Sequence, residues 1–332
     1  MLTNANILVT GGTGSFGQAF VRMTLPRYNP ARLVVFSRDE MKQWEMARRY
    51  ADDHRVRFFI GDVRDSRRLH RALDGIDYVV HAAALKIVPA AEYNPFEYVN
   101  TNIQGAVNLI DACIDQRVKR LVALSTDKAS SPINLYGATK LVSDKLFVAG
   151  SSYVGRHTTR FSVVRYGNVM GSRGSVIPYF LSLRSKPKLP ITDPRMTRFM
   201  ITIEQGVELV WRAFGDMQGG EVYVKKIPST KVVDIAKAVN PDAEHEIVGI
   251  RPGEKLHEQM IGTEDAANTY DFGDYYKIMP AFSSFERDAS ALSAGRKVPD
   301  NFVYSSENNS EWMTIEMLRS WIEDNRLRLI EI

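Results

Sequence analysis

Residues 7–17 read Ile-Leu-Val-Thr-Gly-Gly-Thr-Gly-Ser-Phe-Gly. The apolar run at their start is typical of a buried strand, and a helical pattern begins where the glycines end. Glycines at this spacing let the chain turn tightly and approach a bound diphosphate, and a helix N-terminus offers unpaired N–H groups to that anion. The stretch therefore predicts a dinucleotide site formed by Gly11, Thr13, Gly14, Ser15, Phe16 and Gly17.

Further short apolar runs follow, separated by helical segments, at residues 33–36, 56–60, 78–80, 121–124 and 162–166. Alternating strands and helices indicate a parallel sheet that is covered on both faces. The expected fold class is therefore α/β, a Rossmann-like doubly wound parallel sheet with a smaller, loop-rich substrate-binding region.

The regular pattern ends near Asn168, where glycines and prolines become frequent. We expect residues 1–168 to form the dinucleotide-binding domain and residues 169–332 to form mainly the substrate-binding region and a C-terminal extension. The later run at 222–224 can return to the main sheet. Residues 312–330 have an amphipathic pattern that predicts a helix.

Composition narrows the class of protein. The chain has 332 residues, 44% of them hydrophobic, and a net charge of +4, without the long basic run of a nucleic-acid-binding protein. No apolar stretch of about 18 residues predicts a membrane span, and we expect a cytoplasmic protein. The single cysteine, Cys113, excludes an internal disulfide and is expected to be buried, and the histidines and cysteine form no metal-ligand pattern.

The residues after the second strand predict the cofactor. Ser37 and Arg38 occupy the position where an acidic residue would bind a free ribose 2′-hydroxyl, whereas a hydroxyl and a guanidinium suit a 2′-phosphate. Lys42 can add a second cation, so NADP is favoured over NAD. Asp39 and Glu40 leave NAD open, since a register shift could bring them to the ribose. Other expected cofactor contacts are Asp62, Val63, Ala82, Ala83, Lys86 and Thr101, while His81 is expected to pack in the core.

Residues 125–140 carry the reacting groups: Ser-Thr-Asp-Lys-Ala-Ser-Ser-Pro-Ile-Asn-Leu-Tyr-Gly-Ala-Thr-Lys. Tyr136 and Lys140 are four residues apart and so share a helix face. We expect Lys140 to lower the pKa of the Tyr136 phenol from its usual ~10 towards neutrality. The phenolate can then take a proton from a substrate hydroxyl while the adjacent carbon loses a hydride to the nicotinamide, whose ribose Lys140 would also hold.

The preceding triplet Thr126, Asp127 and Lys128 adds an elimination to this oxidation. A ketone acidifies the neighbouring C–H, so a base can abstract that proton while an acid protonates a leaving hydroxyl on the next carbon. We assign Lys128 as the base at C5, Asp127 as the acid towards the C6 hydroxyl, and Thr126 as a hydrogen-bond donor to O4. This division requires a protonated Asp127 and a Lys128 made partly neutral by Lys140, Lys86 and the nicotinamide.

With these motifs the chain resembles the extended short-chain dehydrogenase/reductase family, and within it the inverting UDP-N-acetylglucosamine 4,6-dehydratases that begin pseudaminic acid biosynthesis. The resemblance covers nearly the whole chain. It rests on residues 10–17, 37–40, 125–129 and 132–140, and continues in Arg-Tyr-Gly-Asn-Val at 165–169, Gly-Ser-Arg-Gly-Ser-Val at 171–176 and Arg-Pro-Gly-Glu-Lys-Leu-His-Glu at 251–258.

The resemblance implies UDP-N-acetylglucosamine as substrate, a tightly bound and recycled NADP, a homo-oligomer and inversion at C5. Lys128 stands where dTDP- and GDP-sugar dehydratases have a glutamate, and Tyr136 is absent from the membrane-bound retaining enzymes. The implied substrate contacts are Lys86, Thr126, Tyr136, Asn168, Gly174, Ser175, Val176, Ile177, Pro178, Arg198, Arg251 and Glu254. Arg195 could take the place of Arg198, and His257 and Glu258 are interpreted as structural.

Three alternatives remain open. A UDP-hexose 4-epimerase would need Tyr136 and the cofactor but no elimination pair, so Asp127 and Lys128 argue against it. A C5-retaining UDP-sugar 4,6-dehydratase also stays open, because residue chemistry alone permits reprotonation on either face of C5. A non-catalytic nucleotide-sensing protein is possible on this fold, but the catalytic set is complete.

Overall fold

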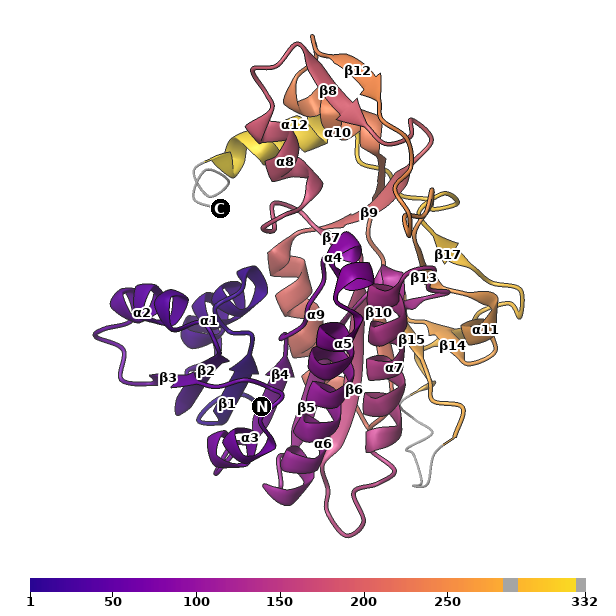
Figure 1. Cartoon of the computed structure of the whole chain (residues 1–332). Helices are drawn as coiled ribbons and strands as arrows, with labels where there is room; N and C mark the ends of the chain where they lie inside the picture. The colour runs from indigo at the N-terminus through magenta and orange to yellow at the C-terminus, as the bar shows by residue number, and fades with distance from the viewer. Residues whose placement is uncertain (283–291, 327–332) are drawn as a thin grey trace.

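The structure, a computed structural model, describes residues 1–282 and 292–326. A ten-stranded sheet dominates this part of the chain (Figure 1). Seven parallel strands come first in spatial order: β3 (Val56–Ile60), β2 (Arg32–Ser37), β1 (Asn6–Thr10), β4 (Tyr78–His81), β5 (Arg120–Thr126), β6 (Arg160–Tyr166) and β10 (Val222–Lys225). Three antiparallel strands complete it: β15 (Tyr275–Ile278), β14 (Thr269–Asp271) and β16 (Arg296–Lys297).

Helices cover both faces of the sheet (Figure 1). On one face α3 (Ser66–Ala72), α6 (Gly105–Asp115) and α7 (Leu135–Gly150) lie side by side, and on the other α1 (Ser15–Tyr28) packs beside α9 (Ile203–Asp216). Helix α2 (Glu40–Arg49) flanks β2 and β3. The central strands are therefore buried on both sides, which explains their continuous apolar sequence.

A smaller lobe lies beyond the carboxyl ends of the parallel strands, at the top of Figure 1. It contains α8 (Val176–Ser182), α10 (Val232–Val239), α12 (Ile315–Asp324) and the parallel pair β8 (Lys188–Ile191) and β12 (Glu244–Ile247). Its own apolar core includes Ile177, Phe180, Leu189, Ile235 and Leu318. A three-stranded sheet leads into it, formed by β11 (Ser229–Lys231), β9 (Thr197–Ile201) and β7 (Asn168–Val169).

Short elements line the edge between the two parts. After β4 come α4 (Val88–Tyr93), α5 (Pro95–Tyr98) and the π-helix η1 (Val99–Gln104), and after β5 comes the single 3₁₀ turn η2 (Asp127–Ala129). The antiparallel pair β13 (Gln259–Ile261) and β17 (Tyr304–Ser305) lies beside η2, with α11 (Thr263–Ala266) next to it. The carboxyl edge of the sheet is thus enclosed by segments from widely separated parts of the chain.

The six strands expected in the first half of the chain are all present, in the spatial order 3-2-1-4-5-6 of a doubly wound fold. The run at 222–224 does return to the sheet, as β10 beside β6. The predicted C-terminal helix is shorter than its pattern: α12 ends at Asp324 and buries Leu318 and Ile322, while residues 327–330 lie outside the described residues.

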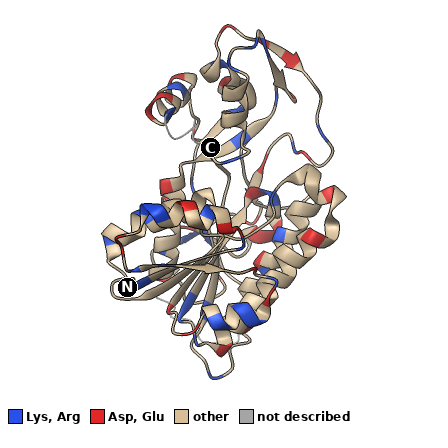
Figure 2. Ribbon diagram, turned by 60° about the vertical axis from the view of Figure 1, so that its left-hand side comes forward, with Lys and Arg blue, Asp and Glu red and all other residues tan. Residues whose placement is uncertain are grey.

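Basic and acidic side chains occur together on the same helices (Figure 2). Among the residues that the structure describes, no helix is both long and apolar enough to cross a membrane.

The glycine turn after β1 yields a stability prediction. A Cβ on Gly17 would lie 2.4 Å from the Gly12 backbone, so we expect Gly17→Ala to lower the free energy of unfolding by about 2 kcal/mol. The matched control is Gly215→Ala in α9, where a Cβ would lie 4.0 Å from Met1 and the helix should tolerate or gain from alanine. Urea unfolding measures both changes, and equal stabilities of the two variants would contradict the close packing of the turn.

Candidate active site

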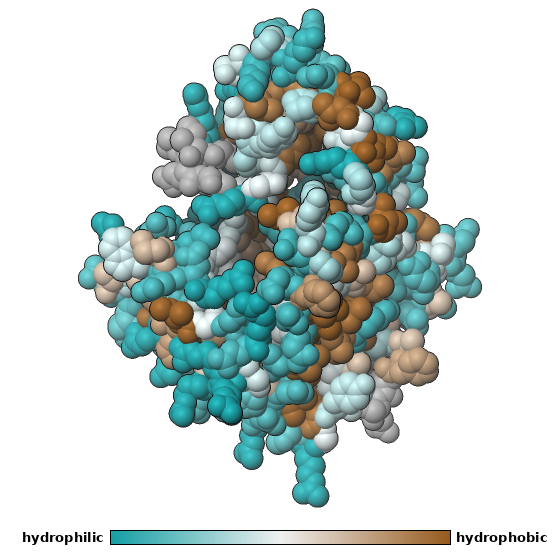
Figure 3. All heavy atoms as spheres, in the orientation of Figure 1, coloured by the Kyte–Doolittle hydropathy of each residue, from teal (hydrophilic) through white to brown (hydrophobic). Residues whose placement is uncertain are grey.

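The expected catalytic groups meet at the carboxyl edge of the sheet. The turn η2 follows β5 directly, and α7 begins a few residues later. Helix α7 lies beneath the smaller lobe (Figure 1). Figure 3 shows the surface hollowed between the lobe and the sheet. This is the edge at which doubly wound sheets bind their ligands.

The turn η2 is organised by its own polar side chains. The Thr126 hydroxyl accepts a hydrogen bond from the Lys128 backbone N–H at 3.3 Å and donates one to Asp127 Oδ1 at 3.0 Å. Lys128 Nζ lies 3.0 Å from the same Asp127 oxygen. Burial of Asp127 raises the pKa of its carboxyl, and the nearby Lys128 ammonium offsets that rise only in part. A carboxyl with a raised pKa suits a proton donor.

Tyr136 and Lys140 lie on the first two turns of α7, where the Asn134 side chain caps the helix by accepting from Gly137 N–H at 2.7 Å. Both side chains are buried. Lys140 Nζ donates to the Leu124 carbonyl at the end of β5 at 2.9 Å, and burial lowers the pKa of this amine. The helix therefore presents the tyrosine and the lysine to the same strand end as η2.

Two expectations about protonation are wrong for this structure. Burial raises the pKa of Tyr136 to about 12, and the groups that most oppose the rise are Lys128 and Thr126 rather than Lys140. Burial lowers the pKa of Lys128, but the carboxylates of Asp127 and Glu258 outweigh it and raise that pKa above its ordinary value. The sequence pattern gives spacing but not burial, and burial dominates here.

Glu258 is the site residue that the sequence reasoning missed. Its carboxylate lies immediately before β13 and is buried, and Oε1 lies 3.0 Å from Lys128 Nζ. The sequence interpretation of Glu258 as structural rests on the lack of another His or Cys nearby that would complete a metal site. The spacing also gives no partner for its carboxylate among residues so far back in the chain. The matched run at 251–258 is the only local signal, and it gives no partner for the carboxylate.

The structure fits a dinucleotide at the glycine turn. Gly11 has φ of +65°, and a Cβ there would lie 2.8 Å from the Ala83 backbone N, so the turn and the Ala82–Ala83 segment are in close contact. Gly14 caps α1 without a side-chain hydrogen bond, which leaves first-turn N–H groups for an anion. In the described residues the buried Thr101 hydroxyl lacks a hydrogen-bond partner, as a ligand-facing group would.

The residues expected at the adenosine ribose lie together. Ser37 Oγ is 2.8 Å from Thr13 Oγ1, and Arg38, half exposed, has a nitrogen 3.8 Å from Asp62 Oδ2. Asp39 accepts from the Lys42 backbone as the cap of α2 and pairs with the Lys42 ammonium at 2.7 Å. Because the Asp39 carboxylate already caps α2, Arg38 is better placed than Asp39 to contact a substituent on the ribose.

Some of the expected substrate residues make polar contacts or, in the part of the chain that the structure describes, leave buried polar atoms free, and the others are placed here only by the element that carries them. Arg251 is mostly exposed and pairs with Glu254 at 2.5 Å, and Lys86 Nζ donates to the Arg173 carbonyl at 3.2 Å. Ser175 Oγ and Glu254 Oε2 are buried without a hydrogen-bond partner among the described residues. Asn168 lies in β7, Gly174 precedes the Ser175 cap, and Val176, Ile177 and Pro178 form the first turn of α8.

Arg198 has a different environment from the one expected of a diphosphate ligand. Its guanidinium is buried and donates to the carbonyls of Thr197 at 2.7 Å and Leu256 at 3.0 Å through one nitrogen, and to Lys255 at 3.1 Å through the other. It thereby holds the segment that carries Glu258. Its alternate, Arg195, is exposed and paired with Asp193 at 2.7 Å.

Other singled-out residues lie away from this chemistry. Cys113 is buried in α6, as expected, and His81 packs in the core with Nδ1 2.8 Å from Thr10 Oγ1. His257 contacts Thr197 at 2.9 Å. Within residues 1–282 and 292–326, no three His, Cys, Asp or Glu side chains gather as a metal site.

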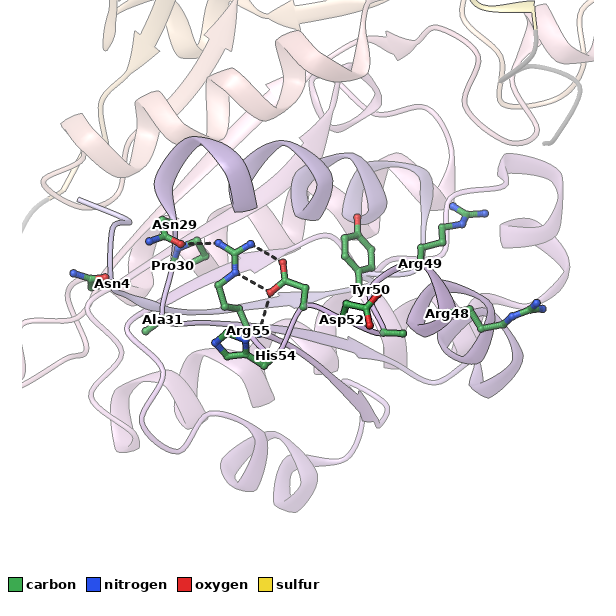
Figure 4. A pocket seen from close by; sticks show the side chains of 12 residues that line it. Asn4, Asn29, Pro30, Ala31, Arg48, Arg49, Tyr50, Asp52, His54 and Arg55 are labelled. Carbon is green, nitrogen blue, oxygen red and sulfur yellow. Dashed lines mark hydrogen bonds and ion pairs between the residues drawn. The ribbon is translucent and has the colours of Figure 1, made fainter.

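A separate surface hollow of about 820 Å³ lies at the opposite edge of the sheet, near the amino ends of the first three strands (Figure 4). Its walls include Arg55, whose guanidinium is paired with Asp53 at 2.5 Å and donates to Asn29 at 2.7 Å. Because the catalytic residues lie at the other edge of the sheet, this hollow plays no part in the site.

Comparisons with known proteins agree with the motifs. The family model described as "Polysaccharide biosynthesis protein" matches residues 7–280. The UDP-N-acetylglucosamine 4,6-dehydratase (inverting) of Campylobacter jejuni subsp. jejuni serotype O:23/36 (strain 81-176) is 52% identical over 94% of this chain and 95% of the relative. The expected resemblance to inverting dehydratases is thus confirmed.

Two solved structures support the fold. Pen from Bacillus thuringiensis superposes with a TM-score of 0.89 at 35% identity, covering 98% of this chain and 99% of that one. DesIV (dTDP-glucose 4,6-dehydratase) from Streptomyces venezuelae, with NAD and TYD bound, superposes with a TM-score of 0.68 at 26% identity, covering 76% and 86%. The Rossmann-like fold is confirmed, and the second structure carries a nicotinamide cofactor.

The buried carboxyl of Asp127 yields a pH-dependent prediction. Because its pKa is raised in the folded protein, the ionised form costs stability above that pKa, and the cost disappears as the pH falls towards the ordinary value of 3.8. We therefore expect Asp127→Asn to melt at a higher temperature than the wild type at neutral pH, with the difference shrinking in acid.

The matched control is Asp193→Asn, since hydrogen bonds from Arg195 lower the pKa of Asp193 to about 2 and the opposite sign applies. That variant should gain nothing at neutral pH. Thermal melts monitored by circular dichroism over a pH series measure both variants. A neutral-pH melting temperature of Asp127→Asn at or below that of the wild type would contradict the raised pKa.

Proposed function

We propose that this chain, which belongs to the polysaccharide biosynthesis protein family, is a UDP-N-acetylglucosamine 4,6-dehydratase that inverts C5. The observation that carries the proposal is the contact between Lys128 Nζ and Asp127 Oδ1 at 3.0 Å, in the same pocket as Tyr136. An oxidation at C4 requires only the tyrosine and a hydride acceptor. The acid and base pair adds the loss of water, and the relative from Campylobacter supports the substrate and the inversion.

The first half-reaction oxidises C4. A bound nicotinamide supplies reversible hydride transfer. Tyr136 accepts the proton of the O4 hydroxyl, and Thr126 donates a hydrogen bond to O4. Because burial holds the Tyr136 pKa near 12 in this structure, the tyrosine needs nearby positive charge when it reacts, and Lys128 already acts in that direction.

The second half-reaction removes water and reverses configuration. Lys128 first gives a proton to Asp127, which leaves a neutral amine beside a protonated carboxyl. The amine then takes the C5 proton, and Asp127 gives its proton to the C6 hydroxyl, which departs as water. After C6 regains the hydride, Lys128 returns its proton to C5 on the opposite face, giving UDP-2-acetamido-2,6-dideoxy-β-L-arabino-hex-4-ulose. The pair thus needs one shared proton to begin.

The cofactor is proposed to be NADP, bound tightly and recycled. Ser37 and Arg38 offer a hydroxyl and a guanidinium at the end of β2, which suit a ribose 2′-phosphate, and the capping role of Asp39 argues against an acidic contact with a free 2′-hydroxyl. Arg251 and Glu254, on the turn ahead of Glu258, are proposed to contact the UDP moiety, because the guanidinium is exposed and one buried oxygen of Glu254 lacks a partner in the described structure.

The second candidate is the 4-epimerase, which shares Tyr136 and the cofactor. The Lys128 ammonium between two carboxylates disfavours it, since epimerisation removes no C5 proton and no hydroxyl. C5 retention would use the same groups with reprotonation on the original face. The configuration at C5 of the product therefore distinguishes an inverting from a retaining dehydratase.

The reaction test uses purified enzyme with UDP-N-acetylglucosamine in deuterated water, followed by NMR. We expect a 4-keto-6-deoxy product of L-arabino configuration with deuterium at C5, because Lys128 exchanges its proton with solvent. Lys128→Met should abolish deuterium incorporation at C5 and lower the rate by at least about a hundredfold, as for loss of a general base. A 4-epimer without loss of water from the wild type would overturn the function, and normal C5 exchange in Lys128→Met would overturn the base assignment.

Cofactor choice is tested at Arg38. Replacing its guanidinium by Arg38→Ala removes a charge-assisted partner of a 2′-phosphate, so we expect the affinity for NADP to fall by about tenfold and that for NAD to change little. Arg48→Ala, an exposed arginine of α2 that stacks on Trp44, is the matched control. Calorimetric titration of cofactor-stripped protein measures both, and equal losses for NADP and NAD would contradict a 2′-phosphate contact.

A further inference from the structure

Hydrogen bonds hold the segment just before β13, residues 255–258, on both of its sides. The Glu258 N–H donates to Ser306 Oγ at 2.9 Å, and the Ser306 N–H donates back to the Glu258 carbonyl at 2.8 Å. On the other side the Thr197 N–H donates to the Leu256 carbonyl at 3.1 Å, and Arg198 donates to the same carbonyl. The backbone of this segment is therefore fixed by β9 and by the chain after β17.

Two side chains of this segment reach back to the catalytic turn. Lys255 Nζ donates to the Ser130 carbonyl at 2.7 Å, and Glu258 Oε1 lies 3.0 Å from Lys128 Nζ. The Glu258 side chain is only 3% exposed, and its other oxygen has no hydrogen-bond partner among the described residues. A buried carboxylate without its counter-ion is costly, so Glu258 and Lys128 depend on each other.

We propose that Glu258 is the positioning residue of the acid and base pair: its carboxylate holds Lys128 Nζ within reach of Asp127 and keeps one proton shared between the two. The inference rests on the proposed roles of Asp127 and Lys128. It adds a third member to their chemistry, which acts through Lys128 and needs no contact with substrate or cofactor.

The charges around the group support this role. Lys128 faces Asp127 and Glu258, with Arg198, Lys86, Lys255 and the Tyr136 phenol around them. Arg198 Nε is 3.9 Å from Glu258 Oε1, farther than Lys128, so the lysine is the principal partner. The negative charge of Glu258 raises the pKa of both Lys128 and Asp127. Its removal should therefore lower both values and move the range in which the pair holds one proton to lower pH.

Two variants distinguish the effect of the negative charge of Glu258 from that of the length of its side chain. Glu258→Gln keeps the size and removes the charge, so we expect kcat to fall by about a hundredfold, KM for UDP-N-acetylglucosamine to remain unchanged, and the pH optimum to move to lower pH. Glu258→Asp keeps the charge on a shorter side chain, so kcat should fall while the optimum stays near that of the wild type. Glu264→Gln, which removes a carboxylate bonded to Ser131 near the same turn, is the matched control and should behave as the wild type.

A second readout is independent of turnover. Competitive acetylation of the holoenzyme with acetic anhydride over a pH series, read by mass spectrometry, reports the pKa of Lys128, whose side chain is partly accessible. We expect that pKa to fall in Glu258→Gln and not in Glu264→Gln. If the wild type fails to turn over UDP-N-acetylglucosamine, the proposed function fails while this measurement still decides the role of Glu258.

The inference is overturned by an unchanged Lys128 pKa in Glu258→Gln, or by a loss of kcat in that variant without a shift of the pH optimum. Should Glu258→Gln fail to fold, Glu258→Asp decides: a kcat equal to that of the wild type would show that the reach of the carboxylate is immaterial. Circular dichroism and the melting temperature of each variant identify that case.

Discussion

The catalytic edge of this protein depends on one ammonium group, Lys128 Nζ, which lies 3.0 Å from each of two carboxylates. Asp127 and Glu258 are both buried, and each would be costly without a positive partner. The lysine thus connects the turn after β5 to the segment before β13. These two contacts hold the proposed acid, Asp127, and the proposed base, Lys128, against the segment that carries Glu258.

The fold makes such a meeting possible because parallel strands deliver their following residues to one edge. The turn η2, the start of α7 and the glycine turn after β1 arrive there from the sheet, and the smaller lobe brings the segment 251–258 from the other side. Arg198 contributes by bonding to carbonyls of that segment. Arg198, which the sequence predicts as a substrate ligand, thus holds the segment that carries Glu258, and Glu258 in turn contacts Lys128.

The sequence predicts those parts that depend on local spacing. The glycine turn, the succession of strands and helices, and the shared face of Tyr136 and Lys140 follow from periodicities of a few residues, and the structure has each of them. The roles of the individual site residues remain predictions. Glu258 could not be paired with Lys128 in advance, because the contact joins distant segments. The sequence also could not predict that the pKa values of Tyr136 and Lys128 are raised, because these shifts depend on burial and, for Lys128, on the distant Glu258 carboxylate.

The central claim is that oxidation at C4 and elimination across C5 and C6 occur in one pocket, with a single hydride carried between them. The most direct measurement uses UDP-N-acetylglucosamine deuterated at C4, incubated with holoenzyme in ordinary water and followed by NMR and mass spectrometry. The account predicts that the deuterium appears at C6 of the 4-keto-6-deoxy product. Deuterium retained at C4 of an epimerised sugar, or lost to solvent, would contradict it.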